Sequence, residues 1–221
     1  MRKEVSCTPV HAVLEYAEKH GLPSKKLLAG VPYSIDYLRN KHERIEWNEY
    51  CTIMSNLRSI WSDEDIVRMG YGITSTIPFR NLVSVARLLF TGPEIYHYWV
   101  ANARSPGKQF FDCITAAIEQ FGRNHIVLSL TLPPDHRYCR ELFLITKGSI
   151  SAATVVMRLG PARVSMRETK EGAIYDIICP TGGGAFSWLR KALVWPFAAR
   201  TVARELREAN ESQHERYAQL E

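Results

Sequence analysis

The chain has 221 residues, of which 46% are hydrophobic and 23% are charged, and its formal net charge is +5 at pH 7. This composition is that of an ordinary soluble protein that buries a core. The basic residues form no Lys/Arg run, so we predict no direct contact with nucleic acid. No stretch approaches the roughly 18 consecutive apolar residues of a membrane span, so we predict none.

Five cysteines are scattered along the chain without a Cys-x-x-Cys pair. They are Cys7, Cys51, Cys113, Cys139 and Cys179. An odd number at wide spacing predicts reduced, mostly buried thiols and not a disulfide framework. The N-terminal residues are charged and then amphipathic, with no apolar signal core. We therefore expect a cytoplasmic protein.

The first hundred or so residues predict a bundle of helices. Thr8 followed by Pro9 is a favourable helix start, because a hydroxyl can cap the helix and proline suits its first position. Ser34 and Ser62 are further predicted caps, and Gly21 is a predicted stop. The predicted helices cover residues 8–20, 24–30, 34–39, 47–61, 63–70, 79–90 and 94–103.

Residues 42–47 read HERIEW and mix charged side chains with Ile45 and Trp47. One interpretation is a binding loop. The interpretation we favour is that the segment caps and staples the following helix, with Trp47 in the core.

The pattern changes after residue 106. Residues 110–122 and 125–134 flank Gly-Arg-Asn and predict a hairpin, although the first arm would also suit a helix. A long helix is expected at 136–159. A second hairpin is expected from 162–168 and 173–179, which flank Thr-Lys-Glu-Gly. The order is helices followed by ββαββ, so the predicted fold class is α+β, with one antiparallel sheet covered by helices.

We divide the chain into a sensory domain at 1–180, made of a helical lobe at 1–106 and a ββαββ lobe at 107–180, a Gly-rich joint at 181–187 and a connector with a coiled-coil signalling helix at 188–221. The joint contains three successive glycines, which give flexibility. The connector begins WLRKALVWPFAAR at residue 188, and a membrane-surface helix would look similar. Because Pro196 interrupts it and basic residues are few, we favour a connector that packs against the domain.

Common catalytic and metal-binding patterns are missing from the sequence. It has no phosphate-binding glycine loop with a lysine, no dinucleotide-binding glycine motif, no Gly-x-Ser-x-Gly and no His-Glu-x-x-His. The seven histidines show no metal-ligand spacing. We therefore predict that this segment is not an enzyme, that it has no catalytic residues and that it holds no metal site.

The densest unusual cluster is EIYHYWV at residues 94–100. Aromatic rings line small-molecule pockets, and a histidine among them can bind a ligand or haem iron. We name Tyr96, His97 and Trp99 as candidate ligand-binding residues. The alternative is a structural helix whose rings pack on the bundle while His97 faces solvent.

The last residues form a weak heptad register that predicts a dimer. Positions a and d hold mostly small or polar residues, and Asn210 at an a position favours a two-stranded pairing while reducing its stability. A marginal seam of this kind suits a signalling helix with two states of similar energy. The predicted seam consists of Ala199, Ala203, Leu206, Asn210, Gln213, Tyr217 and Leu220.

Four stretches, residues 30–70, 86–99, 141–153 and 205–221, resemble the N-terminal input region of bacterial sensor histidine kinases and nucleotide-cyclase receptors. The helices followed by ββαββ are also similar, more distantly, to the haem-based H-NOX domain and to the effector domain of AraC-like regulators. The resemblance implies a regulatory input and dimerisation domain that senses a small ligand or protein partner and relays it through the coiled coil. It also implies that the full-length protein is a histidine kinase or cyclase.

The H-NOX resemblance implies a proximal histidine ahead of the first hairpin, where His97 stands. It also implies a Tyr-x-Ser-x-Arg motif that anchors the haem propionates. The corresponding region, residues 128–136, reads LSLTLPPDH and lacks the tyrosine and the arginine. We therefore predict no cofactor. The alternatives are a haem-based gas sensor with His97 as axial ligand, an AraC-like effector domain and a purely structural interaction module.

Overall fold

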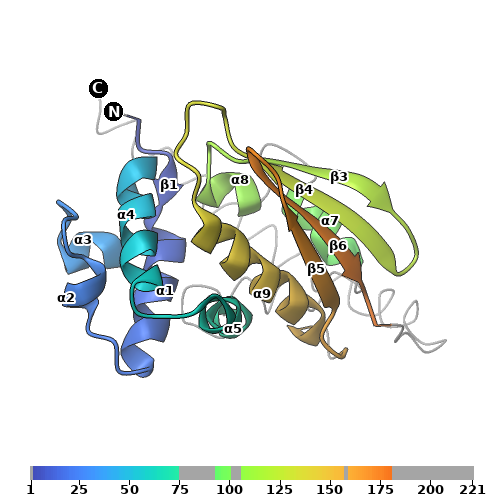
Figure 1. Cartoon of the computed structure of the whole chain (residues 1–221), viewed down its shortest axis with the longest axis horizontal. Coiled ribbons are helices and arrows are strands. Elements are labelled where there is room, and N and C mark those ends of the chain that lie inside the picture. The colour runs from blue at the N-terminus through green and yellow to red at the C-terminus, as the bar shows by residue number, and fades with distance from the viewer. Residues whose placement is uncertain (1, 75–92, 101–105, 157–158, 181–221) are drawn as a thin grey trace, which may run out of the picture.

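The structure is a computed structural model that describes residues 2–74, 93–100, 106–156 and 159–180. The helices before residue 60 gather at one end of the molecule, and the helix after Ser62 lies closer to its middle (Figure 1). Their bounds are α1 Cys7–Lys19, α2 Ser24–Leu27, α3 Ile35–Arg39, α4 Trp47–Arg58 and α5 Asp63–Ile73.

Side-chain caps start several of these helices. The Ser34 hydroxyl accepts a hydrogen bond from the backbone N–H of Tyr37, and Ser62 forms a reciprocal capping box with Asp65, so both predicted caps are confirmed. Helix α1, however, is capped by Ser6 and not by Thr8. Ser6 has an extended backbone, which lets its hydroxyl accept from the N–H of Thr8 at 3.2 Å.

A small two-stranded sheet in this part of the chain was not predicted. Strand β1, Val5–Ser6, pairs antiparallel with β2, Arg44–Ile45. Two residues per strand are too few for a period-two pattern to be visible in the sequence. The pairing ties the start of the chain to the residues just before α4.

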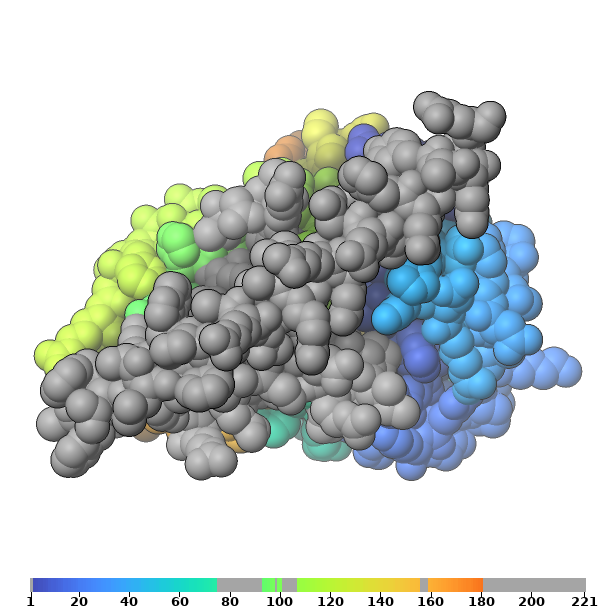
Figure 2. Space-filling view, turned by 180° about the vertical axis from the view of Figure 1, so that it is seen from behind, coloured from blue at the N-terminus to red at the C-terminus, as the bar shows by residue number. Residues whose placement is uncertain are grey.

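The larger sheet has four antiparallel strands in the order β3-β4-β6-β5. Both predicted hairpins are present, and the first arm is a strand. The elements of this part are α7 Glu94–Val100, α8 Pro106–Phe110, β3 Thr115–Phe121, β4 His125–Thr131, α9 Arg140–Val156, β5 Arg163–Glu168 and β6 Gly172–Ile178. Seen from behind, the N-terminal helices and the β3–β4 hairpin occupy opposite ends of the molecule (Figure 2).

Helix α9 lies between the N-terminal helices and the sheet (Figure 1). On the sheet side, the buried Tyr175 of β6 donates its hydroxyl to the carbonyl of Phe143 at 3.0 Å. At its start, Arg140 pairs with Asp63 of α5 and with Glu168 of β5. The helix therefore joins the two halves of the described chain.

Helix α9 begins at Arg140, four residues later than the predicted start at residue 136. The preceding loop is held in another conformation, because the carbonyl of Arg137 accepts a hydrogen bond from the indole N–H of Trp47 at 2.9 Å. Residues 137–139 therefore belong to this loop and not to the helix.

Helices α5 and α9 cross at close range, and glycines allow the approach. A β-carbon on Gly148 would lie 2.6 Å from the backbone nitrogen of Tyr71, and one on Gly70 would lie 2.7 Å from the carbonyl carbon of Ile145. At the same crossing, the Ser149 hydroxyl donates to the Gly70 carbonyl at 2.9 Å. The predicted helix at 63–70 therefore continues through Gly70 to Ile73.

The order of elements and the antiparallel sheet confirm the predicted α+β class. All five cysteines are buried and free of disulfides, as predicted. None of the described helices is long and apolar enough to cross a membrane. The predicted helix at 79–90, the Gly-rich joint and the coiled-coil helix at 188–221 lie outside the described residues.

Candidate functional site

Helix α7 positions the three aromatic candidates of the sequence, and they face different neighbours. Tyr96 is 2% exposed and donates its hydroxyl to the carbonyl of Ile150 on α9 at 2.9 Å. Burial raises the pKa of this phenol well above its usual value. Tyr96 therefore anchors α7 to α9 and is not open to a ligand.

His97 is exposed, and its imidazole lies edge-on to the ring of Phe121 at the end of β3, with the ring centroids 6.0 Å apart. Phe121 is itself 51% exposed. Among the described residues, no side chain or main-chain group is seen to hydrogen-bond the imidazole of His97. Trp99 is half-buried, and its ring packs against that of Phe110 on α8, with the ring centroids 5.9 Å apart.

The structure thus places the three candidates on one short helix but not around one ligand: Tyr96 points to α9, His97 to β3 and Trp99 to α8. The residues of the predicted dimer seam, from Ala199 to Leu220, lie outside the described part of the chain.

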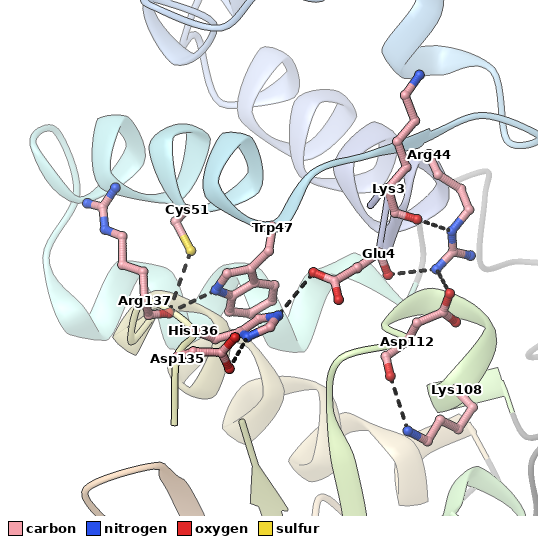
Figure 3. Close-up of polar contacts among 10 residues, drawn as sticks. All are labelled: Lys3, Glu4, Arg44, Trp47, Cys51, Lys108, Asp112, Asp135, His136 and Arg137. Atoms are coloured by element: carbon pink, nitrogen blue, oxygen red, sulfur yellow. Dashed lines mark hydrogen bonds and ion pairs between the residues drawn. The ribbon is translucent and has the colours of Figure 1, made fainter. Parts of the chain in front are cut away.

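A polar network that the sequence did not predict lies where the N-terminal segment meets α4 and the loop before α9 (Figure 3). Arg44 is its hub. Its guanidinium donates to the main-chain carbonyls of Lys3 at 3.1 Å, Glu4 at 2.6 Å and Gln109 at 2.8 Å, and it pairs with Asp112 at 3.1 Å. Arg44 therefore fastens the first residues of the chain to the segment that follows α8.

Trp47 fastens the other side of this network. Its side chain is 3% exposed, and its indole N–H donates to the carbonyl of Arg137. The Cys51 thiol lies 3.9 Å from the same oxygen. Trp47 therefore lies in the core, as we predicted, but the predicted capping is not seen, because Glu46 at the N-cap of α4 makes no side-chain cap hydrogen bond.

His136 lies beside Trp47 and is held between two carboxylates (Figure 3). Its Nε2 is 3.0 Å from Glu4 Oε2 and its Nδ1 is 3.2 Å from Asp135 Oδ1. The side chains of His136 and Glu4 are only 16% and 15% exposed. Partial burial opposes the charged imidazole, but the two carboxylates outweigh it, and the pKa of His136 is raised.

The sequence matches no protein-family model and no curated protein. Solved H-NOX structures, in contrast, share the fold. An Fe(II) unliganded H-NOX protein from K. algicida is 12% identical with a TM-score of 0.58, and 83% of this chain covers 100% of that chain. A point mutant of the H-NOX domain from Shewanella oneidensis, in the Fe(II)CO ligation state, is 11% identical with a TM-score of 0.52, and 80% of this chain covers 98% of it.

A third structure comes from work on haem redox potential and protein-induced porphyrin distortion. It is 13% identical with a TM-score of 0.55, and 79% of this chain covers 99% of it. The chain therefore has the H-NOX fold, which confirms the predicted resemblance to the H-NOX domain. At these identities the likeness defines the fold and not the residues of a site.

The same comparisons correct the prediction that no cofactor is involved. That prediction rested on a missing motif, whereas the structures that share this fold were studied as Fe(II) and haem proteins. An absent anchor motif is weaker evidence than a shared architecture, because a cofactor can be held by other residues of the same fold.

The described residues bear on two parts of a haem site, the iron ligand and the propionate anchor. His97 offers an accessible imidazole of the kind that binds haem iron. The region that the resemblance implies for the propionate anchor ends at His136, whose Nε2 already faces the Glu4 carboxylate. The nearby Arg44 already donates to main-chain carbonyls and pairs with Asp112. Both side chains are therefore already paired with protein groups.

Proposed function

We propose that the chain is the sensory domain of a signal-transduction protein and that it takes haem, with His97 as the axial ligand. The observation that supports this most strongly is the H-NOX fold over about four fifths of the chain, 83% in the first comparison above. The accessible imidazole of His97 on α7 supports the choice of ligand. A bound haem would supply an iron centre that can take a small gas molecule.

The contacts of α7 supply a route for the signal. His97 and Tyr96 are neighbours on this short helix, so a pull on His97 also moves Tyr96. Tyr96 is hydrogen-bonded to Ile150 of α9, and α9 packs against both α5 and the sheet. A small movement of α7 is thereby passed to the helix that joins the two halves of the fold.

We expect a sensory and not a catalytic role for this segment. The output would lie in a kinase or cyclase module linked through residues 181–221, and the weak seam from Ala199 to Leu220 would pair two copies of the chain. The ligand must favour one arrangement of the paired helices over the other, since a ligand with equal affinity for both shifts nothing.

The test of the haem proposal is the absorption spectrum of protein expressed with haem supplied. The wild type is expected to show a Soret band, and His97→Ala is expected to lose most of it, because the iron loses its protein ligand. His125→Ala, which removes a half-buried histidine on β4, is the control and should keep the band. A colourless wild type, or a His97→Ala variant with an unchanged spectrum, would contradict the proposal.

The dimer proposal predicts that deleting residues 199–221 weakens self-association. Removing the seam should raise the dissociation constant by about tenfold or more, which corresponds to about 1.4 kcal/mol. Analytical ultracentrifugation of the two chains measures the effect. Asn210→Leu is the opposite variant and should tighten the dimer, because an apolar residue at an a position adds stability. A truncated chain that dimerises as tightly as the full chain would rule out the seam.

A further inference from the structure

Three side chains that bind transition metals converge beside the polar network. A carboxylate oxygen of Glu4, the sulfur of Cys113 and a ring nitrogen of His136 all lie within 4.8 Å of one another. They come from the N-terminal segment, the segment between α8 and β3, and the loop between β4 and α9. Because they are more than twenty residues apart at every step, no spacing motif in the sequence could reveal them.

The backbone around these residues is fixed by pairing. Val5 forms an antiparallel bridge with Phe111, and the N–H of Asp112 donates to the Glu4 carbonyl at 2.9 Å. Glu4 and Cys113 are therefore brought together by main-chain contacts. His136 is brought to them by its loop, which the Trp47 indole holds through the carbonyl of Arg137. Side chains supported in this way suit a site that needs fixed geometry.

The combination of ligands selects the metal. Thiolate and imidazole are ligands of zinc and related metals, whereas Mg²⁺ and Ca²⁺ prefer oxygen alone. Three protein ligands also leave one position of a tetrahedral zinc site for water or another donor. A cysteine in the set therefore points away from a simple acidic cation site.

Asp135 supplies an independent feature of such a site. Its carboxylate faces Nδ1 of His136 at 3.2 Å, on the opposite side of the ring from the Nε2 that faces Glu4. Histidines that bind metals through one nitrogen usually donate the other N–H to a carboxylate, which fixes the tautomer and the ring orientation. The ring of His136 is thus already oriented with Nε2 toward Glu4.

A reactive cysteine is a poorer explanation of the cluster. Burial, with the negative charge of Glu4 as a smaller cause, raises the pKa of the Cys113 thiol to about 12. A buried, protonated thiol is neither a good nucleophile nor a redox sensor at neutral pH. A metal ion stabilises the thiolate form directly, so coordination remains open to this residue.

We propose that Glu4, Cys113 and His136 bind one Zn²⁺ ion, with Asp135 orienting the histidine. The ion would staple the start of the chain to the segment after α8 and to the loop that leads into α9. This inference does not depend on haem binding, because none of the four residues lies on α7. It differs from our prediction from the sequence, which was that the chain has no metal site because its histidines lack metal-ligand spacing.

The experiment uses the full chain without added haem, freed of metal by a chelator and then titrated with Zn²⁺ or Co²⁺. One equivalent of Zn²⁺ should bind, by calorimetry, and Co²⁺ should give a thiolate-to-cobalt charge-transfer band in the near-ultraviolet. Cys113→Ser should abolish that band. Asp135→Asn changes an 82% exposed side chain, so it should fold normally and bind Zn²⁺ about ten- to a hundredfold more weakly.

Two matched controls separate a metal site from an ordinary ion pair. Cys179→Ser removes a different buried thiol. His125→Gln removes a histidine whose Nε2 also faces a carboxylate, that of Asp176 at 3.2 Å, in an exposed pair outside the cluster. Both should keep Zn²⁺ affinity and the cobalt band. A wild type without stoichiometric Zn²⁺, or a cobalt band that survives Cys113→Ser, would overturn the proposal and leave Glu4 and His136 as an ion pair only.

Discussion

Replacing Gly148 with alanine is expected to destabilise the protein by about 3 kcal/mol or more. Gly148 lies in the middle of α9, where α5 crosses it. The added β-carbon would lie 2.6 Å from the backbone nitrogen of Tyr71 and 2.9 Å from the carbonyl carbon of Gly70, and closer still to the carbonyl oxygen of Val67. All three are main-chain atoms of α5, so no side-chain rotation can relieve the overlap.

Helix propensity works in the opposite direction but is too weak to compensate. Alanine is favoured over glycine in a helix interior by about 1 kcal/mol. Relief of the overlap requires α5 and α9 to move apart, which would break the hydrogen bond from Ser149 to the Gly70 carbonyl and loosen the buried contacts at the crossing. The steric cost therefore exceeds the gain in propensity.

Urea denaturation of the wild type and the variant measures this effect as a lower midpoint with a similar slope. Gly160→Ala is the matched control, because a β-carbon there would meet no atom within 4 Å and the glycine does not have a positive φ. That variant should be neutral or slightly stabilising, since alanine lowers the entropy of the unfolded chain. Equal midpoints for Gly148→Ala and the wild type would mean that the two helices do not cross at this distance.

The same crossing explains one limit of reading the fold from the sequence. Glycine is a strong signal for the end of a helix, and on that basis the helix that begins after Ser62 is expected to stop at Gly70. The helix continues to Ile73, because Gly70 is needed for contact with α9 and not for a turn. A requirement set by a partner helix far along the chain leaves no local trace.

Several features with local causes were predicted well, although the predicted Thr8 cap was wrong, because Ser6 caps that helix. The Ser34 and Ser62 caps depend on residues within one helical turn, and both hairpins depend on short turns between strands. The α+β class follows from their order. The predicted start of α9 was wrong, because it is set by a distant contact between Trp47 and the loop that precedes the helix.

The candidate site residues also fall into those that the sequence could identify and those that it could not. His97 could be found from the sequence because it stands in a dense aromatic segment, but its direction, toward Phe121 and away from Tyr96, could not. The convergence of Glu4, Cys113 and His136 could not be found at all. It depends on how the first residues pair with the segment after α8, which is a property of the assembled fold.

Trp47→Ala is expected to destabilise the protein by about 3–5 kcal/mol. Two losses combine in this variant. A large side chain that is 3% exposed is removed from its contacts with Tyr50 and the ring of His136, which leaves a cavity. The carbonyl of Arg137 also loses the indole N–H at 2.9 Å, and the Cys51 thiol at 3.9 Å is a weak replacement.

Trp47→Phe separates these two losses. Phenylalanine keeps most of the ring packing but has no donor, so the loss of stability should fall to about 0.5–1.5 kcal/mol, the net contribution of one hydrogen bond, since the Cys51 thiol still faces the Arg137 carbonyl. Trp61→Ala is the control for loss of an indole. Because Trp61 is only half-buried, this variant should lose less stability than Trp47→Ala. Denaturation midpoints rank the three variants. If Trp47→Ala were no worse than Trp61→Ala, Trp47 would not be the side chain that holds the loop before α9. Since that loop carries His136, its position beside Glu4 would then need another support.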